Sequence, residues 1–485
     1  MYTIKFYDGF MSRMQTIFKN MSWLMISQII ASVCAFIWTI LMARYLGVSN
    51  YGIFGFATSL SGMLAITVDL GIGTHVVRHV ATDYESAPKY VGNAIPLKSL
   101  FSLGTFILTL SILIILGADQ LTINVTLLFT LEMIIKSFIS FINGIFQAFE
   151  EGKYQGIGNT LLNVILFIFI LIAIFVDLGI YGIAIAYILA NVIALIYVYY
   201  ILENRISKPK FELDKEFCKK ITLYSIPFAL TSILYSIYYS IDVVMLTNLV
   251  GNYATGIYNA AYKLISVLTL FYSVYIAVIF PVMSKLFKND ESMLLISYEK
   301  SIKYLMLIIV PLAVSTLFYS LEITQLMYGH NFDASSSVLS ILIWTVCLLF
   351  VSGASNNLLN ASHKEVTVTK IYFIAALFNI ILNFFMIPYF SYIGAAITTV
   401  LSDVLIVVIQ CYVIYKLGYR PNTKLYYDLI KIIIASLILG IVLQVLNLNM
   451  WVAMPAGTLI YFVMVFILKV FDDDDKYVIK DILGK

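Results

Sequence analysis

The chain has 485 residues, of which 61% are hydrophobic and 12% are charged, and its formal net charge at pH 7 is +3. An ordinary globular domain carries about 25% charged residues, so this composition, with a mean hydropathy of +0.95, excludes a water-soluble protein. The small, dispersed positive charge also excludes the basic surface of a nucleic-acid-binding protein.

Apolar stretches long enough to cross a bilayer recur about fourteen times along the chain. We predict that each is a helix, because hydrocarbon offers the backbone no hydrogen-bond partners and the stretches do not alternate as barrel strands do. The fold class is therefore an all-α integral membrane protein. The predicted spans lie near residues 21–43, 51–71, 94–117, 123–148, 156–176, 181–202, 221–248, 254–282, 302–325, 336–360, 367–388, 393–416, 426–447 and 450–470.

The loops between these spans are too short for a folded catalytic domain. Fourteen helices of about 20 residues each leave roughly 14 residues for each loop or tail. The sequence also lacks the GxxxxGK[ST] loop that binds nucleotide phosphates. We therefore predict that the protein is not an enzyme and needs no cofactor.

The distribution of Lys and Arg predicts the orientation, because cytoplasmic loops attract positive charge. With the N-terminus inside, all of the 30 Lys and Arg residues fall on the cytoplasmic side except Arg44, Lys136 and Lys263. This cytoplasmic set includes Lys98 and Lys303, near the starts of the third and ninth spans. We predict a multi-pass protein of the cytoplasmic membrane with both termini in the cytoplasm.

Two stretches of sequence occur twice. Leu41–Ala57, LMARYLGVSNYGIFGFA, resembles Met245–Ala261, MLTNLVGNYATGIYNAA, with Gly52 aligned with Gly256. Further on, DLGIYGIAIAYIL around Gly182 resembles YFSYIGAAITTVL around Gly394, before the sixth and twelfth helices. Repeats of six helices each predict parallel halves related by an axis along the membrane normal, with a cavity between them.

The predicted division of the chain follows from this repeat. Residues 1–203 form an N-terminal half with the first six spans, and residues 204–420 form a C-terminal half with the next six. Residues 421–485 add two spans and a cytoplasmic tail.

Ionisable side chains inside predicted spans are candidate functional residues, because each costs roughly 2.5–3.5 kcal/mol to insert. Glu132 and Lys136 lie four residues apart on one helix face, where they form either a structural ion pair or part of a substrate or coupling site. Asp242 and Lys263 flank the loop GNYATG. They either pair and lock two helices together, or Lys263 faces the cavity and binds an anionic head group.

Three further charged residues are candidates for binding the substrate or a coupling cation. Arg44 either extends to the membrane interface or binds phosphate oxygens with its planar guanidinium. Asp69 and Asp403 are candidates for binding a coupling cation, although a position near the interface is the simpler explanation for Asp69.

Aromatic and histidine side chains also recur at helical spacing. Tyr235, Tyr238 and Tyr239 either stack on sugar rings or pack between helices, and Tyr238 is our candidate for substrate binding. His75 and His79 are spaced like a metal-binding pair, but no acidic residue stands between them, so we predict no metal site.

Several motifs together resemble those of a known family. The first two helices contain ARYLGVSNYGIF and DLGIG, and the seventh and eighth contain IDVVMLTNLVGNYATGIYNAAYKL. They are similar to the Arg-x-Leu-Gly, Tyr-Gly, Asp-x-Gly and Gly-x-Tyr-x-x-Ala-Tyr-basic signatures of the Wzx-type polysaccharide, or O-antigen, flippases. These belong to the multidrug/oligosaccharidyl-lipid/polysaccharide (MOP) exporter superfamily.

This resemblance implies transport by alternating access. A polyprenyl diphosphate-linked oligosaccharide would enter a V-shaped cavity from the cytoplasmic leaflet, and the two halves would rock to release it outside. Arg44 and Lys263 match positions where the family carries basic residues. The implied partners are the lipid-linked oligosaccharide, membrane lipids, and glycosyltransferases or a polymerase of the same pathway.

The main alternative is a MATE-like multidrug antiporter of the same superfamily, which would exchange cationic drugs for sodium or protons. Its cavity would need acidic residues, for which the chain offers Glu132, Asp242 and Asp403. A membrane glycosyltransferase or polymerase would need a large outer loop, and the longest one, around GHNFDASS, is too short.

Overall fold

The computed structural model describes residues 2–212, 214–446 and 449–471, which form helices joined by short turns, with no strand among them. Ten helices within these ranges are long and apolar enough to cross a membrane. The predicted all-helical membrane architecture is therefore confirmed. The predicted cytoplasmic tail lies, from residue 472 onward, outside the described residues.

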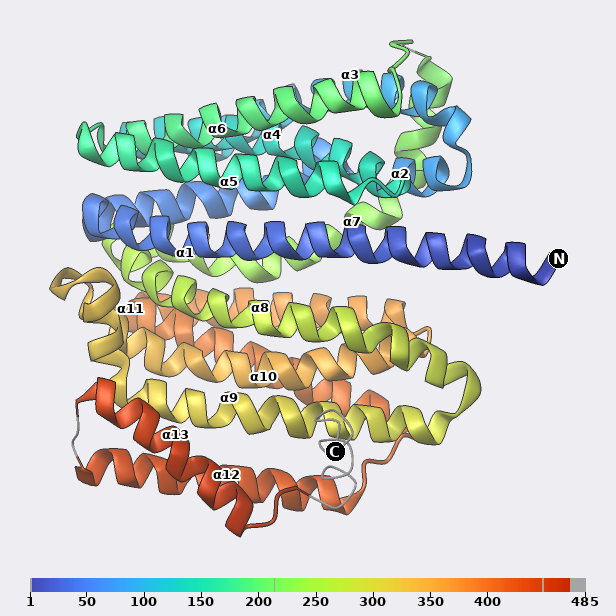
Figure 1. The fold of residues 1–485 in the computed structure, drawn as a ribbon. Helices are drawn as coiled ribbons and strands as arrows, with labels where there is room; N and C mark the ends of the chain where they lie inside the picture. The colour runs from blue at the N-terminus through green and yellow to red at the C-terminus, as the bar shows by residue number, and fades with distance from the viewer. Residues whose placement is uncertain (1, 213, 447–448, 472–485) are drawn as a thin grey trace. The chain divides into compact units, whose positions relative to one another are not determined.

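The chain forms two compact units, residues 1–256 and 257–485, which we call the N-terminal and C-terminal units. Most helices of the N-terminal unit lie nearly parallel or antiparallel to one another (Figure 1). This unit also contains the first turn of α8 (Asn252–Asn289). Its other helices are α1 (Tyr2–Asp69), α2 (Ile72–Thr82), α3 (Ala87–Ile115), α4 (Gln120–Ala148), α5 (Gly152–Phe175), α6 (Gly179–Ile201) and α7 (Lys215–Leu249).

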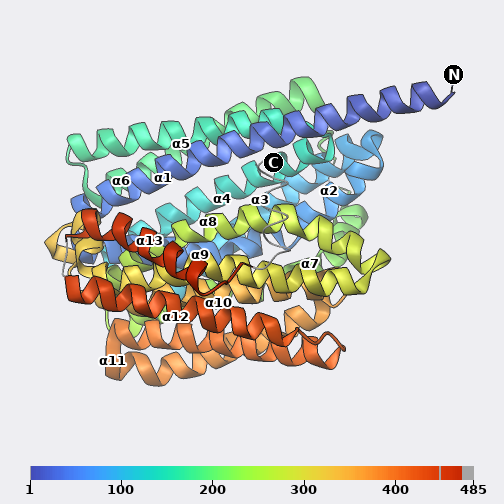
Figure 2. The ribbon, with the colours of Figure 1, turned by 60° about the horizontal axis from the view of Figure 1, so that its bottom comes forward.

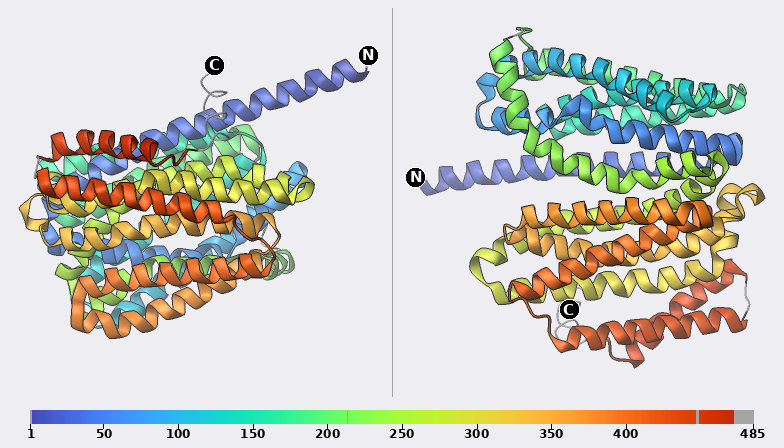
Figure 3. Two further views of the ribbon diagram at one scale, coloured as in Figure 1. Left: turned by 90° about the horizontal axis from the view of Figure 1, so that it is seen from below. Right: turned by 180° about the vertical axis from the view of Figure 1, so that it is seen from behind.

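The C-terminal unit contains the rest of α8 and five further helices. Within it, α10 packs against α9 and α11, and α12 and α13 pack against α9 and each other (Figure 2). The two parts of α11, before and after a break at Ser391, lie side by side (Figure 3). The helices are α9 (Glu291–Tyr328), α10 (Ser335–Ala361), α11 (Glu365–Lys416), α12 (Thr423–Leu446) and α13 (Met450–Ile467).

Tight turns with a left-handed backbone separate successive helices at equivalent places in the sequence repeats. Gly47 breaks α1 in two with φ of 68°, and Gly251, at the same place in the second copy of the motif, separates α7 from α8 with φ of 116°. Gly179 starts α6 with φ of 63°, and Ser391, its counterpart, breaks α11 with φ of 52°. Residues that carry a Cβ atom rarely adopt positive φ, so glycine is favoured at such turns. Ser391 is the exception among these four.

The two copies of the first motif meet at their aligned glycines. A Cβ atom on Gly52 would lie 1.8 Å from the carbonyl oxygen of Asn252, and one on Gly256 would lie 2.0 Å from the carbonyl oxygen of Val48. Each glycine thus faces the backbone of the other copy one helical turn earlier. Small residues allow helices in membranes to approach this closely, so the contact requires glycine on both sides.

A buried apolar cluster of the N-terminal unit packs α2 against the start of α3 and the last turns of α4 and α6. Ile72, Val76 and Val80 of α2 are fully buried against Ile145 and Phe146 of α4, in a cluster that also includes residues of α3 and α6. The apolar side chains of α2 recur at the spacing of one helix face. This short helix is thereby fixed across the end of the bundle.

We expect Gly52→Ala to destabilise the protein, because a methyl group would overlap the backbone of Asn252. Overpacking of this kind typically costs about 1–3 kcal/mol. Thermal unfolding of the detergent-purified protein measures the effect. Gly104→Ala in α3 is the matched control, since nothing lies within 4 Å of its Cβ position. Equal unfolding temperatures for Gly52→Ala and wild type would contradict the close approach.

Candidate functional site

Asp69, Lys98 and Ser137 form a charged cluster in the N-terminal unit. The Lys98 ammonium on α3 donates hydrogen bonds to the Asp69 carboxylate at the end of α1 and to Ser137 Oγ on α4, the latter at 3.0 Å. The Lys98 side chain is 0% exposed, and that of Asp69 is 32% exposed. Asp69 also accepts the Gly73 backbone N–H at 3.2 Å, so it helps to order the start of α2.

This cluster changes the interpretation of Asp69 as a cation-binding residue. Its carboxylate is already neutralised by Lys98, which a coupling cation would have to displace. Lys98 was assigned to the cytoplasmic loops by the charge pattern, yet it is buried among α1, α3 and α4 and lies 5.6 Å from the ring centroid of Phe141. The sequence did carry one indication that Lys98 is buried, because the residue lies inside the predicted span 94–117.

Glu132 lies inside the bundle of the N-terminal unit, where it has a neutral hydrogen-bond partner and also interacts electrostatically with Lys136. Its Oε1 accepts a hydrogen bond of 3.0 Å from the Asn191 side-chain amide on α6. Both residues are buried, at 8% and 1% exposure, whereas Lys136 is exposed. The structure therefore joins Glu132 to α6 by a hydrogen bond.

The other charged candidates lie in both units. Arg44 is exposed near the end of the first part of α1, and Asp242 on α7 is buried at 5% exposure. Lys263 on α8 and Asp403 on α11 are half-buried in the C-terminal unit. Phosphate binding by Arg44 and Lys263, cation binding by Asp403, and a pair between Asp242 and Lys263 stay predictions.

A second buried ion pair fastens α12 to α9 in the C-terminal unit. Lys303 Nζ lies 2.8 Å from Asp428 Oδ2, and the two side chains are 3% and 6% exposed. Lys431 lies 3.7 Å from the other oxygen of Asp428. The Tyr461 hydroxyl of α13 adds a hydrogen bond of 2.8 Å to the carbonyl of Leu307 on α9. The charge pattern placed Lys303 at a span end but gave no indication of this partner.

The two histidines of α2 pack as aromatic rings. Their centroids are 4.6 Å apart, His75 stacks on Tyr224 of α7, and His79 stacks on Tyr90 of α3. Burial, and the neighbouring His79, lower the pKa of His75 below its usual value. No group of three or more His, Cys, Asp or Glu side chains within the described ranges is arranged to hold a metal ion.

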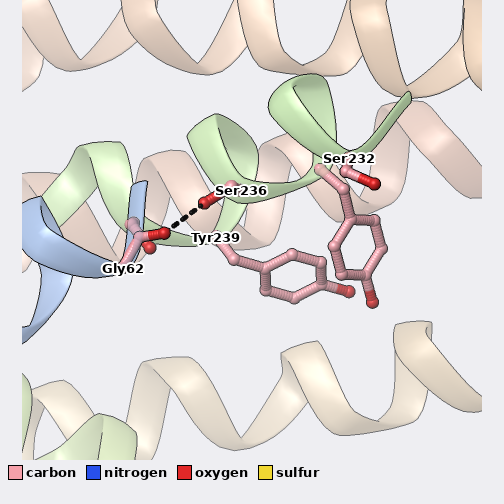
Figure 4. A pocket seen from close by; sticks show the side chains of 6 residues that line it. Gly62, Ser232, Ser236 and Tyr239 are labelled. Carbon is pink, nitrogen blue, oxygen red and sulfur yellow. Dashed lines mark hydrogen bonds between the residues drawn. The ribbon is translucent and has the colours of Figure 1, made fainter. Parts of the chain in front are cut away.

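A pocket of about 440 Å³ lies between α7 and the second part of α1, with a largely apolar lining that carries several hydroxyl groups (Figure 4). The Ser236 hydroxyl donates a hydrogen bond of 3.3 Å to the carbonyl of Gly62. The α7 residues of the pocket lie on one helix face, since each recurs three or four residues after another member of the set. The lining consists of Gly62 on α1 and Ser232, Tyr235, Ser236, Tyr239 and Ser240 on α7.

The pocket distinguishes among the three tyrosines of α7. Tyr238, our candidate from the sequence, is only 5% exposed, and its ring packs edge-on against Tyr239 with centroids 5.3 Å apart. Tyr235 and Tyr239 line the pocket instead, with ring centroids 4.4 Å apart. The sequence identified this group of tyrosines, but it did not show which of them face the pocket and which are buried.

Comparison with known proteins identifies the family of this fold. Residues 17–287 match the family described as polysaccharide biosynthesis protein, and residues 227–385 match the MatE family. The first match covers more than half of the chain, so the chain belongs to the polysaccharide biosynthesis protein family. The predicted resemblance to polysaccharide flippases of the MOP superfamily is confirmed.

Relatives similar to this chain occur in archaea and bacteria. An uncharacterized membrane protein of Methanocaldococcus jannaschii, MJ1068, is 26% identical over 98% of this chain and 99% of its own length. The capsular polysaccharide biosynthesis protein CapF of Staphylococcus aureus is 23% identical over 82% and 99%. The probable low-salt glycan biosynthesis flippase Agl15 of Haloferax volcanii is 26% identical over 78% and 79%.

Two solved structures share the fold at low sequence identity. The lipid II flippase MurJ in an inward closed conformation has a TM-score of 0.75 and 16% identity, covering 92% of this chain and 98% of that one. An inward-facing MATE transporter of the MOP superfamily has a TM-score of 0.67 and 16% identity, covering 81% and 96%.

We expect Lys98→Met to destabilise the N-terminal unit, because Asp69 would lose its buried counter-charge. Breaking a buried ion pair by removing one partner costs about 3–5 kcal/mol, and the partial exposure of Asp69 favours the lower end. The double variant Asp69→Asn with Lys98→Met should recover part of this loss, since it leaves no charge behind. Unfolding temperatures in detergent test both statements, and a double variant no more stable than Lys98→Met would refute the pair's role.

Proposed function

We propose that this protein translocates a polyprenyl diphosphate-linked oligosaccharide across the cytoplasmic membrane by alternating access. The observation that carries the proposal is the match of residues 17–287 to the polysaccharide biosynthesis protein family. The relatives named as a capsular polysaccharide biosynthesis protein and a glycan flippase support it, as does the fold shared with a lipid II flippase. The protein acts as a transporter and not as an enzyme.

The chain crosses the membrane fourteen times in this proposal. The breaks at Gly47 and Ser391 divide α1 and α11 into two spans each, and α7 and α8 are also long enough to cross. Both termini then lie in the cytoplasm, as the distribution of Lys and Arg indicates. The symmetric contact of Gly52 with the backbone of the second motif supports two related six-helix halves, 1–203 and 204–420, followed by the pair of helices in 421–485.

The charged candidates take separate roles in transport. Arg44 and Lys263 bind the diphosphate, with Lys136 as a further basic contact, because phosphate oxygens need fixed cations to replace their hydration. Asp242 and Asp403 are the candidates for coupling, and Asp69 and Glu132 act mainly in structure through Lys98 and Asn191. Glycosyltransferases or a polymerase of the same pathway supply and consume the substrate.

A MATE-like cation-coupled antiporter is the second candidate, favoured by the MatE match at residues 227–385. That function needs acidic residues that are available to cations. In the N-terminal unit, Asp69 is paired with Lys98, and Glu132 is buried against Asn191. These two carboxylates are therefore poor candidates for binding a cationic drug, and an antiporter would depend on Asp242 and Asp403 instead.

We expect the protein in proteoliposomes to flip a fluorescent diphosphate-linked glycolipid. Arg44→Ala and Lys263→Ala should each slow flipping about tenfold or more, because a charge-assisted hydrogen bond contributes about 1.5–3 kcal/mol. Lys208→Ala is the control, since this lysine is 79% exposed and pairs at the surface with Glu203. Protection of the lipid from a membrane-impermeant quencher reports the rate.

The outcomes separate the two candidate functions. Wild-type flipping with unaffected Arg44→Ala and Lys263→Ala variants would keep the flippase and refute their phosphate role. Absence of flipping, together with uptake of a cationic drug driven by a sodium or proton gradient, would establish the antiporter instead.

Flipping should also respond to membrane potential. An inside-negative potential favours outward movement of an anion by about 2.3 kcal/mol per charge per 100 mV, so it can drive the diphosphate outward without ATP. Valinomycin and a potassium gradient impose the potential on oriented proteoliposomes. An initial rate that is equal at zero and at imposed potential would refute this energy source.

A further inference from the structure

If α7 crosses the membrane as the predicted span 221–248, its hydroxyl-bearing face lies at the depth of the membrane interior. The helix extends from Lys215 to Leu249 over 35 residues, which corresponds to about 52 Å at 1.5 Å per residue. Ser232, the first pocket residue, lies about 26 Å from its start, and the pocket residues extend about 12 Å further to Ser240. Since the hydrocarbon core is about 30 Å thick, the pocket belongs to the middle of the span.

The polar groups on this exposed face favour a water-filled cavity over lipid as its surroundings. Tyr235 is 50% exposed and Ser232 is exposed, whereas Ser236 and Tyr239 are half-buried. Polar groups within a span almost always face the protein interior or a water-filled cavity, because hydrocarbon cannot satisfy their hydrogen bonds. Lipid-facing surfaces look different: the exposed residues along α5 include Ile168, Ile172 and Phe175.

The pocket carries no formal charge. All six lining residues are uncharged, and between Lys220 and Lys263 the sequence has no Lys or Arg. Asp242, further along α7, is 5% exposed and is not part of the lining. A phosphate or a carboxylate in contact with this lining would therefore exchange part of its hydration for uncharged groups without gaining a fixed cation, which is unfavourable.

The shape and chemistry of the pocket match an uncharged ring that carries hydroxyl groups. Its volume of about 440 Å³ falls in the range of about 300–1,000 Å³ for small-molecule sites. The neighbouring rings of Tyr235 and Tyr239 are inclined by 46° and present apolar faces with hydroxyls at their tips. Serine hydroxyls can donate and accept by rotating, which suits the varied hydroxyls around a pyranose.

We propose that this pocket binds an uncharged pyranose residue of the transported head group, while the diphosphate binds elsewhere. The inference rests on the proposed function and adds a selectivity to it: neutral hexoses bind at α7, and hexuronic acids bind weakly. Tyr235 and Tyr239 contact the C–H faces of the sugar, and Ser232 and Ser240 contact its hydroxyls.

A binding experiment tests the pocket independently of transport. The full-length protein in detergent is titrated with a free neutral trisaccharide of hexoses and with a matched trisaccharide that contains one hexuronic acid, by saturation-transfer difference NMR. Wild type should bind the neutral sugar more tightly. Tyr239→Ala should weaken this binding about 3- to 10-fold, the factor expected for loss of one aromatic contact. Tyr200→Ala, at a tyrosine of α6 that is 63% exposed and outside the pocket, is the control.

A charge-introducing variant sharpens the test. Ser232→Lys places a cation at the rim, so it should weaken binding of the neutral trisaccharide and strengthen binding of the hexuronic one. If Tyr239→Ala folds poorly, two other variants still test the pocket. Tyr239→Leu keeps an apolar side chain, and Ser232→Lys changes an exposed position. Unchanged affinities of all these variants for both sugars would overturn the pocket's role.

Flipping assays with the same variants separate this inference from the proposed function. We expect KM for a lipid-linked neutral oligosaccharide to rise about 3- to 10-fold in Tyr239→Ala, and the wild type to prefer the neutral substrate over one with hexuronic acid. Wild-type flipping without sugar preference and with an unaffected Tyr239→Ala variant would overturn the pocket and keep the flippase. Failure of the wild type to flip either lipid would overturn the flippase itself.

Discussion

The arrangement of the N-terminal unit depends on the close approach of two backbones at Gly52 and Gly256. A side chain on either residue would overlap a carbonyl oxygen of the other copy of the motif, so the helices can cross here only where both copies keep glycine. The crossing positions the second part of α1, which then packs along α7. Gly62 lies further along the same helix, and its carbonyl accepts the hydrogen bond from Ser236. The crossing thereby helps to bring together the two helices that line the pocket.

The membrane imposes a second constraint, because charged side chains are tolerated more easily near the ends of a span than in the hydrocarbon interior. Lys98 and Lys303 are almost fully buried, and each has an acidic partner within its own unit. Both lie near the predicted cytoplasmic ends of their spans, where pairing and partial hydration lower the cost of insertion. Midway along α7 the polar groups are hydroxyls. The described part of the N-terminal unit thus places the paired Lys98 near a helix end and uncharged hydroxyl groups along the pocket face of α7.

The sequence was sufficient for the features that depend on local pattern. Hydrophobic length predicted the helical membrane fold, and the aligned motifs have equivalent turns in the structure, with positive φ at Gly47 and Gly251. It was insufficient where tertiary contacts decide. Counting positive charges assigns Lys98 to a side of the membrane but cannot show that Asp69 neutralises it. Likewise, Tyr238 and Tyr239 are adjacent in sequence, and only the packing of α7 against α1 determines which ring is buried and which lines the pocket.

The division between neutral pocket and basic residues has a consequence for selectivity. All lipid diphosphate substrates carry the same diphosphate group. Basic residues that contact this group therefore contribute affinity without distinguishing one glycan from another. Rotating hydroxyls also discriminate weakly among neutral sugars, since each can act as donor or acceptor. A charged sugar, in contrast, would lose part of its hydration in an uncharged pocket without gaining a partner, which is unfavourable. Because specificity is a difference between affinities, the pocket selects by rejecting charge and accepts neutral glycans of varied structure.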